Sequence, residues 1–107
     1  MMHKEILCIM SEPLPPVAAI RVFEAVCRHM SFTRAGEELG MTQAAVSYQI
    51  KVLEDRLGAD LFRRRPRRIE LTEIGAQLAP RVTDAFSTLR DAFDGVRQTG
   101  QGTLTIL

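Results

Sequence analysis

The chain has 107 residues, of which 46% are apolar and 25% are charged, and its formal net charge is only +1. This is an ordinary composition for one small soluble domain with an extension, and the bulk charge does not point to a nucleic-acid partner. The charge is nevertheless uneven. Residues 14–72 carry ten Lys and Arg against seven Asp and Glu, whereas residues 1–13 and 73–107 each carry a net charge of −1. A local positive feature is therefore expected within residues 14–72.

Motifs for catalysis, metal binding and membrane insertion are missing from the sequence. The cysteines Cys8 and Cys27 lack CxxC spacing, and the two histidines have no metal-ligand partners at useful spacing. There is no glycine-rich phosphate loop and no Ser/His/Asp or Cys/His constellation, so an enzyme is not predicted. We expect a reduced cytoplasmic protein with Cys27 buried on a helix and with neither cofactor nor metal.

The N-terminal residues 1–13 are expected to be a flexible tail. No stretch approaches the roughly 18 apolar residues of a membrane helix, and the apolar run from Ile6 to Met10 is too short for a signal-peptide core. Met10 is an alternative start to Met1.

Two helical patterns follow the tail. Prolines 15 and 16 suit the entry of a helix that we predict from about Pro16 to His29, where apolar residues recur at helical spacing. Ser31 is a good N-cap for a short second helix, about Phe32–Leu39, and Gly40 suits the left-handed position after it.

A third helix is predicted from Thr42, its N-cap, to Gly58, its C-terminal stop. Its buried stripe at 4-3-4 spacing consists of Val46, Ile50, Leu53 and Leu57. The opposite face carries small, polar or basic groups near the N-terminal half, namely Gln43, Ala44, Ser47, Tyr48 and Lys51. A DNA-recognition helix carries its base-contacting groups there.

An arginine-rich hairpin is predicted after this helix. Residues 61–62 and 69–71 are short strand candidates, and Pro66 suits the first central position of a tight turn. The arginines gathered at the tip are Arg63, Arg64, Arg65, Arg67 and Arg68. The alternative interpretation of such a run is a solvated, unstructured face. Thr72 is then the N-cap of the next helix.

A long helix over residues 73–98 is predicted to mediate dimerisation. Its apolar residues follow a heptad-like seam that consists of Leu78, Val82, Ala85, Leu89, Ala92 and Val96, widened by Phe86 and Phe93. A second copy of the chain is the simplest partner for this face, and the alternative is that the helix folds back on its own domain. Residues 99–107 predict a glycine linker and then a strand, as at the start of another domain.

Four segments of this sequence together resemble the N-terminal DNA-binding domain of LysR-type transcriptional regulators. The resemblance rests on LPPVAAIRVFEAVCRHMSFTRAGEEL, MTQAAVSYQIKVLEDRLG, LFRRRPRRIELTEIG and TLTIL, in this order and spacing. The amino-acid sequence of these segments is most similar to the branch of the family that contains the glycine-cleavage and β-lactamase regulators. The resemblance implies a mainly α fold: a winged helix-turn-helix over residues 14–72, with three helices and a two-stranded wing, followed by a long linker helix.

The resemblance also implies partners. Members of the family form homodimers through antiparallel linker helices, and intact members commonly form tetramers. A small-molecule effector binds a C-terminal domain of periplasmic-binding-protein type, whose first strand would lie in residues 99–107.

Phosphate contacts are expected at the start of the second helix, through Ser31, Thr33 and Arg34. Alternatively, Ser31 is only a cap, and Arg34 pairs with Glu37 or Glu38 on its own helix.

Base reading is expected on the third helix, which begins at Thr42. Gln43 offers a donor–acceptor pair that matches adenine, and Ala44 allows close approach to the groove. Ser47 lies on the same face, and Lys51 reaches a phosphate or a guanine unless it is simply solvated.

Tyr48 departs from the family pattern, in which many members carry arginine. Tyrosine cannot read guanine bidentately as arginine does. We expect it to contact a phosphate or a thymine methyl group instead.

In the wing, Arg64 and Arg67 match two characteristic arginines of the family. Arg67, just past the turn, is the candidate for insertion into a narrow minor groove. Arg63, Arg65 and Arg68 are expected to bind phosphate.

Two alternatives remain open on the sequence alone. One is a winged helix-turn-helix of another family, which would still bind DNA. The other is a helical protein-interaction module whose basic loop meets an acidic partner protein.

Overall fold

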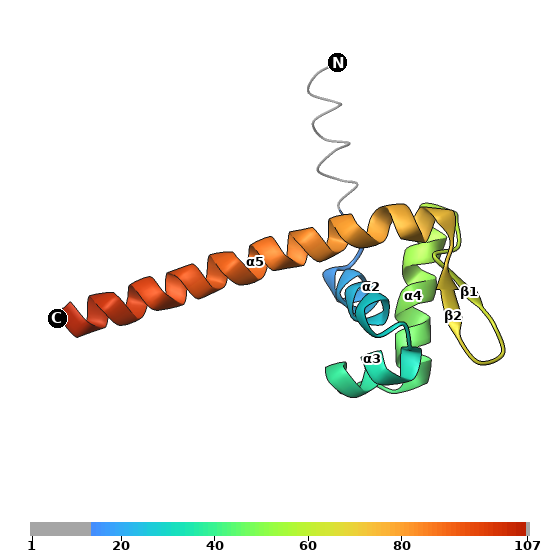
Figure 1. Ribbon diagram of the computed structural model, residues 1–107, viewed down its shortest axis with the longest axis horizontal. Helices are drawn as coiled ribbons and strands as arrows, with labels where there is room; N and C mark the ends of the chain where they lie inside the picture. The colour runs from blue at the N-terminus through green and yellow to red at the C-terminus, as the bar shows by residue number, and fades with distance from the viewer. Residues whose placement is uncertain (1–13, 107) are drawn as a thin grey trace, which may run out of the picture.

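The structure of the chain is a computed structural model that describes the backbone of residues 14–106 and the side chains of residues 14–99. The elements in chain order are α2 (Val17–His29), α3 (Phe32–Leu39), α4 (Gln43–Leu57), β1 (Phe62–Arg64), β2 (Ile69–Leu71) and α5 (Glu73–Ile106). Helices α2, α3 and α4 pack together, the hairpin lies beside α4, and α5 projects away from this unit (Figure 1). The mainly helical fold with a two-stranded wing is the one that the sequence predicted.

The predicted helix caps form hydrogen bonds. The hydroxyls of Ser31 and Thr42 accept from the backbone N–H three residues on, each at 3.1 Å. Thr72 accepts likewise from Gly75 N–H at 3.0 Å. Side-chain acceptors at these positions satisfy N–H groups that the helix itself leaves unpaired.

The ends of α3 and α4 are glycines, as predicted. Gly40 and Gly58 have φ values of 68° and 69°, a left-handed conformation that residues with a Cβ avoid. The end of α2 carries no such sequence signal, because Met30 takes the left-handed position there with φ 49°. Helix α2 itself begins at Val17, with Pro16 at the N-cap, one residue later than predicted.

The core lies where the three helices meet the root of the hairpin. Its largest fully buried side chains are Phe23, Val26, Val46, Ile50 and Leu61. The predicted stripe on α4 is buried through Leu53, but its last member, Leu57, is 47% exposed. Leu57 instead lines an open apolar groove between α2, α4 and α5.

A cluster of ion pairs joins α2 to α3 outside the core. Arg28 Nε donates to Glu24 Oε2 at 2.6 Å, and Arg28 also binds Glu38. His29 Nε2 lies 2.7 Å from Glu38 Oε1. Hydrogen bonds from Arg28 and His29 lower the pKa of Glu38 to about 2, so this carboxylate stays charged at acidic pH values where an ordinary glutamate takes up a proton. The cluster thus links the end of α2 to α3, and Glu38 pairs with Arg28 and His29 and not with Arg34.

Cys27 is a half-buried free thiol on α2. Its partial burial, together with the negative charge of Glu24, raises its pKa to about 12. Cys27 was predicted to be buried on a helix; it does lie on a helix and packs against the core, but it is only partly buried.

Helix α5 packs on the domain only through its first turns. Ala79 is buried, and Leu78 and Val82 pack against the core, whereas Phe93 and Val96 are 67% and 71% exposed. None of the helices in the described part of the chain is long and apolar enough to cross a membrane.

The last turns of α5 differ from the sequence prediction. A linker and a strand were expected over residues 99–107, but the helix continues to Ile106. A strand needs a neighbour that accepts its hydrogen bonds, and no other strand lies beside these turns in the part of the chain that the structure describes. A helix satisfies its own backbone, so it persists here despite Gly100 and Gly102.

Candidate nucleic-acid interface

The start of α3, the start of α4 and the hairpin tip enclose one shallow groove of about 380 Å³. Its lining brings together seven of the predicted contact residues, namely Ser31, Thr33, Gln43, Arg64, Arg65, Arg67 and Arg68. Met30, Phe32, Pro66 and Ile69 complete the lining. The hairpin tip therefore lies at the same end of the domain as the N-terminus of α4, away from α5 (Figure 1).

The remaining predicted contact residues lie outside this groove. Arg34, Thr42, Ala44 and Tyr48 are exposed along α3 and α4, and Tyr48 is the most prominent apolar ring on this surface, at 66% exposure. Their exposure leaves them free to meet a partner that extends beyond the groove.

Lys51 is also exposed, and its Nζ lies 3.4 Å from Asp55 Oδ1. Exposed pairs of this kind contribute little to stability. The ion pair therefore does not prevent Lys51 from turning to a partner.

The hairpin is anchored to α4 by a carboxylate that the sequence prediction missed. Glu54 Oε2 accepts the backbone N–H of Leu61 at 2.8 Å and that of Phe62 at 3.4 Å. β1 then pairs antiparallel with β2, with Phe62 opposite Leu71 and Arg64 opposite Ile69. The strand begins at Phe62 and runs to Arg64, one residue later than predicted. No spacing rule marks Glu54, because its partners are backbone groups at the start of the hairpin.

The arginines of the wing differ in what they contact. Glu70 on β2 pairs with Arg65 at 3.3 Å and with Arg68 at 3.1 Å. Hydrogen bonding to Arg65 lowers the pKa of Glu70. Both pairs are exposed, so they leave Arg65 and Arg68 able to turn to a partner. Arg67 forms no hydrogen bond or ion pair with residues 14–99 and is the free cation at the turn.

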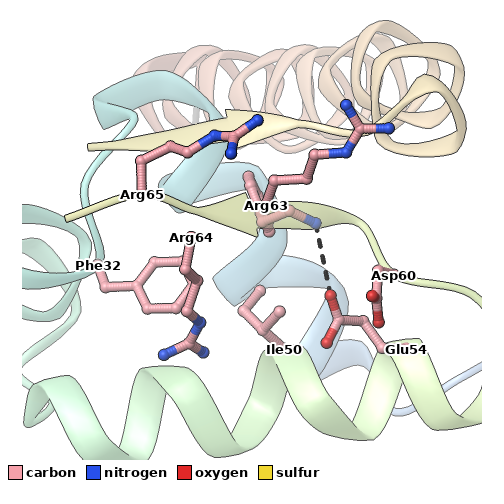
Figure 2. A pocket seen from close by; sticks show the side chains of 8 residues that line it. Phe32, Ile50, Glu54, Asp60, Arg63, Arg64 and Arg65 are labelled. Atoms are coloured by element: carbon pink, nitrogen blue, oxygen red, sulfur yellow. Dashed lines mark hydrogen bonds between the residues drawn. The ribbon is translucent and has the colours of Figure 1, made fainter. Parts of the chain in front are cut away.

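Arg64 points from β1 toward α4 (Figure 2). Its guanidinium carbon lies 4.5 Å from the centroid of the Phe32 ring, and its Nη2 donates to Ser47 Oγ at 2.9 Å. Phe32 packs edge-on against Phe62, with ring centroids 5.7 Å apart. A chain of contacts thus runs from the core through the wing to α4.

This arrangement suits a polyanion with an exposed edge of bases. Backbone N–H groups at the starts of α3 and α4 and several arginines face one surface, which favours phosphate. Helix α4, which lies beside the hairpin, has a width that fits the major groove of DNA. A helix-turn-helix flanked by such a hairpin is a winged helix-turn-helix, a class of DNA-binding fold.

The chain belongs to the LysR family of bacterial regulatory helix-turn-helix proteins, whose family model matches residues 17–76. The resemblance inferred from the sequence is confirmed. The glycine cleavage system transcriptional activator of Escherichia coli strain K12 is 52% identical over 98 residues, which are 91% of this chain and 32% of that protein. The transcriptional activator AmpR of Pseudomonas aeruginosa is 51% identical over 89 residues, 80% of this chain and 30% of that protein.

A solved relative shares the fold. The structure of BenM DBD in complex with catB site 1 DNA superposes with a TM-score of 0.71 at 28% identity, over 78% of this chain and 93% of that one. The predicted branch, glycine-cleavage and β-lactamase regulators, agrees with the names of these curated relatives and of a carbapenem-hydrolysing β-lactamase activator from Serratia marcescens. The chain spans about a third of the length of the curated relatives that it matches.

Proposed function

We propose that this chain binds double-stranded DNA sequence-specifically, as the DNA-binding part of a dimeric LysR-type transcriptional regulator in the bacterial cytoplasm. The observation that carries the proposal is the shared surface of α4 and the wing, where Gln43 and four arginines line one groove. α4 would lie in the major groove, and the wing would lie over the adjacent minor groove and phosphates. The role is one of binding, with no catalytic step.

A gel shift with duplex DNA at several salt concentrations tests this proposal. Binding should weaken steeply with salt, because each neutralised phosphate contributes about −0.9 to the slope of log K against log salt. An acidic protein of similar charge is the competitor. Retention of the acidic protein in place of DNA would support the protein-interaction alternative and contradict the proposal.

Base reading by Gln43 is tested by Gln43→Ala. Gln43 is exposed at the first turn of α4, and a bidentate contact to adenine is worth about 1–3 kcal/mol of discrimination. We expect specific binding to fall by about tenfold or more and non-specific binding to change little, in fluorescence-anisotropy titrations. An equal loss on both kinds of DNA would remove Gln43 from base reading.

Minor-groove insertion of Arg67 is tested by Arg67→Ala. A/T-rich sequences narrow the minor groove and strengthen its negative potential, which attracts an inserted arginine. Arg67 is exposed and unpaired among residues 14–99. We expect the variant to lose the preference for A/T-rich flanks in competition binding, whereas Arg63→Ala, on the strand, should keep it. An unchanged flank preference in Arg67→Ala would contradict the assignment.

Dimerisation through α5 is the second part of the proposal. The exposed side chains Leu89, Phe93 and Val96 continue an apolar groove of about 340 Å³ between α2, α4 and α5. A second α5, antiparallel to the first, would cover both surfaces with apolar contacts.

The lengths of the curated relatives support a further domain after α5 in the intact protein. That domain would bind a small-molecule effector and mediate tetramer formation.

A further inference from the structure

The side chain of Arg64 extends from the wing to two residues of the helix-turn-helix, Phe32 on α3 and Ser47 on α4. Its guanidinium carbon is 4.5 Å from the centroid of the Phe32 ring, and its Nη2 donates to Ser47 Oγ at 2.9 Å. The neighbours Arg63 and Arg65 extend away from this site (Figure 2). Arg64 therefore already has protein partners in the free domain, unlike Arg67.

The partners of Arg64 are themselves fixed. Phe32 is only 6% exposed, and its ring meets Phe62 edge-on at an interplanar angle of 85°. The guanidinium is a rigid planar fork that stacks on aromatic faces. One face on Phe32 and one N–H on Ser47 consequently define both its position and its orientation.

The contact also orients the Ser47 hydroxyl. A serine hydroxyl has one O–H donor and two acceptor lone pairs. The Arg64 N–H occupies one lone pair, and the positive charge of Arg64 favours an O–H proton that points away from it. Ser47 lies three and four residues after Ala44 and Gln43, so it shares their face of α4. On that face, Ser47 presents a hydrogen-bond donor.

We propose that Arg64 is a positioning residue that turns Ser47 into a dedicated donor for base reading. Ser47 then selects a base edge that offers an acceptor, such as purine N7, guanine O6 or thymine O4, over the amino groups of cytosine and adenine. Arg64 affects DNA binding through Ser47 and does not itself contact a DNA phosphate. This inference rests on the proposed DNA-binding function.

The experiment measures affinity for the selected duplex and for duplexes altered at the base pair that Ser47 faces. The variants are Ser47→Ala, Arg64→Met and their combination. Methionine keeps an apolar contact with Phe32 but has no donor. Arg68→Met is the matched control, because it removes the same charge from the exposed turn.

Ser47→Ala and Arg64→Met should each lose about five- to tenfold of the discrimination at that base pair, the typical worth of one hydrogen bond. The double variant should lose no more than either single variant, because both remove the same contact. The salt slope should stay unchanged in Arg64→Met and fall by about 0.9 in Arg68→Met.

A salt slope that falls by about 0.9 in Arg64→Met with discrimination intact would overturn the inference, since Arg64 would then bind a phosphate. Additive losses in the double variant would overturn it too. If Arg64→Met does not fold, Ser47→Ala alone decides, because unchanged discrimination in that variant contradicts a donor role. A wild-type chain that binds no duplex would refute the proposed function instead.

Discussion

Leu89→Asp should convert a dimer into monomers and lower the affinity for a two-fold symmetric duplex by about 10²–10⁴-fold. Leu89 is 50% exposed and lies where the apolar groove meets the free half of the α5 seam. A carboxylate there would be buried without a partner in the dimer, which is strongly unfavourable. The loss on DNA follows because two linked domains bind a double site with a high effective concentration, and separate domains do not.

Sedimentation velocity gives the mass, and fluorescence anisotropy gives the affinity. Ser87→Asp is the matched control, since residue 87 is exposed on the side of α5 opposite to Leu89 and receives the same charge. This control should remain dimeric. The affinity of each variant for a single half-site should equal that of the wild type. A Leu89→Asp variant that sediments as a dimer would show that the seam is not the dimer interface.

Gly75→Ala should destabilise the domain by about 1–3 kcal/mol, as overpacking in a tight site does. Gly75 is buried in the first turn of α5. A Cβ there would lie well inside contact distance of the Leu61 carbonyl oxygen and 2.9 Å from Leu71 Cδ2. The same carbonyl accepts the N–H of Thr72 at 3.0 Å, so the methyl group would strain the joint between α5 and the wing.

Thermal unfolding followed by circular dichroism measures this effect, at about 4–8 °C for each kcal/mol in a domain of this size. Gly95→Ala supplies the control within the same helix. Gly95 is exposed, and a Cβ there meets nothing within 4 Å. Alanine in an exposed helix interior is favoured by about 0.5–1 kcal/mol, so Gly95→Ala should keep or raise the melting temperature. If the Gly75→Ala domain were as stable as the Gly95→Ala domain, the contact between α5 and the wing would accommodate the methyl group without destabilisation, which would contradict the prediction.

The helices were predictable because their signals are local. Ser31, Thr42 and Thr72 cap helices whose first N–H groups lie three residues away, and Gly40 and Gly58 supply the left-handed conformation that ends a helix. Each of these signals depends on a few neighbouring residues. The grouping of Gln43 with the wing arginines was also foreseeable, because the helix-turn-helix order brings them to one surface.

Contacts between distant segments were not predictable from such signals. The bond from Arg64 to Ser47 spans 17 residues, and the pairing of Arg28 with Glu38 spans ten. Glu54 was missed because it binds backbone groups. The strand predicted near the C-terminus depends on pairing with other strands, and such pairing is not a property of the segment itself.

The most direct test of a DNA-binding dimer is the selection of bound duplexes from random sequence by the wild-type chain. We expect enrichment of a two-fold symmetric site, with half-sites separated by about one helical turn or a multiple of it, and A/T-rich sequence where the wing lies. Enrichment of a single asymmetric half-site, or no enrichment over the starting pool, would contradict it.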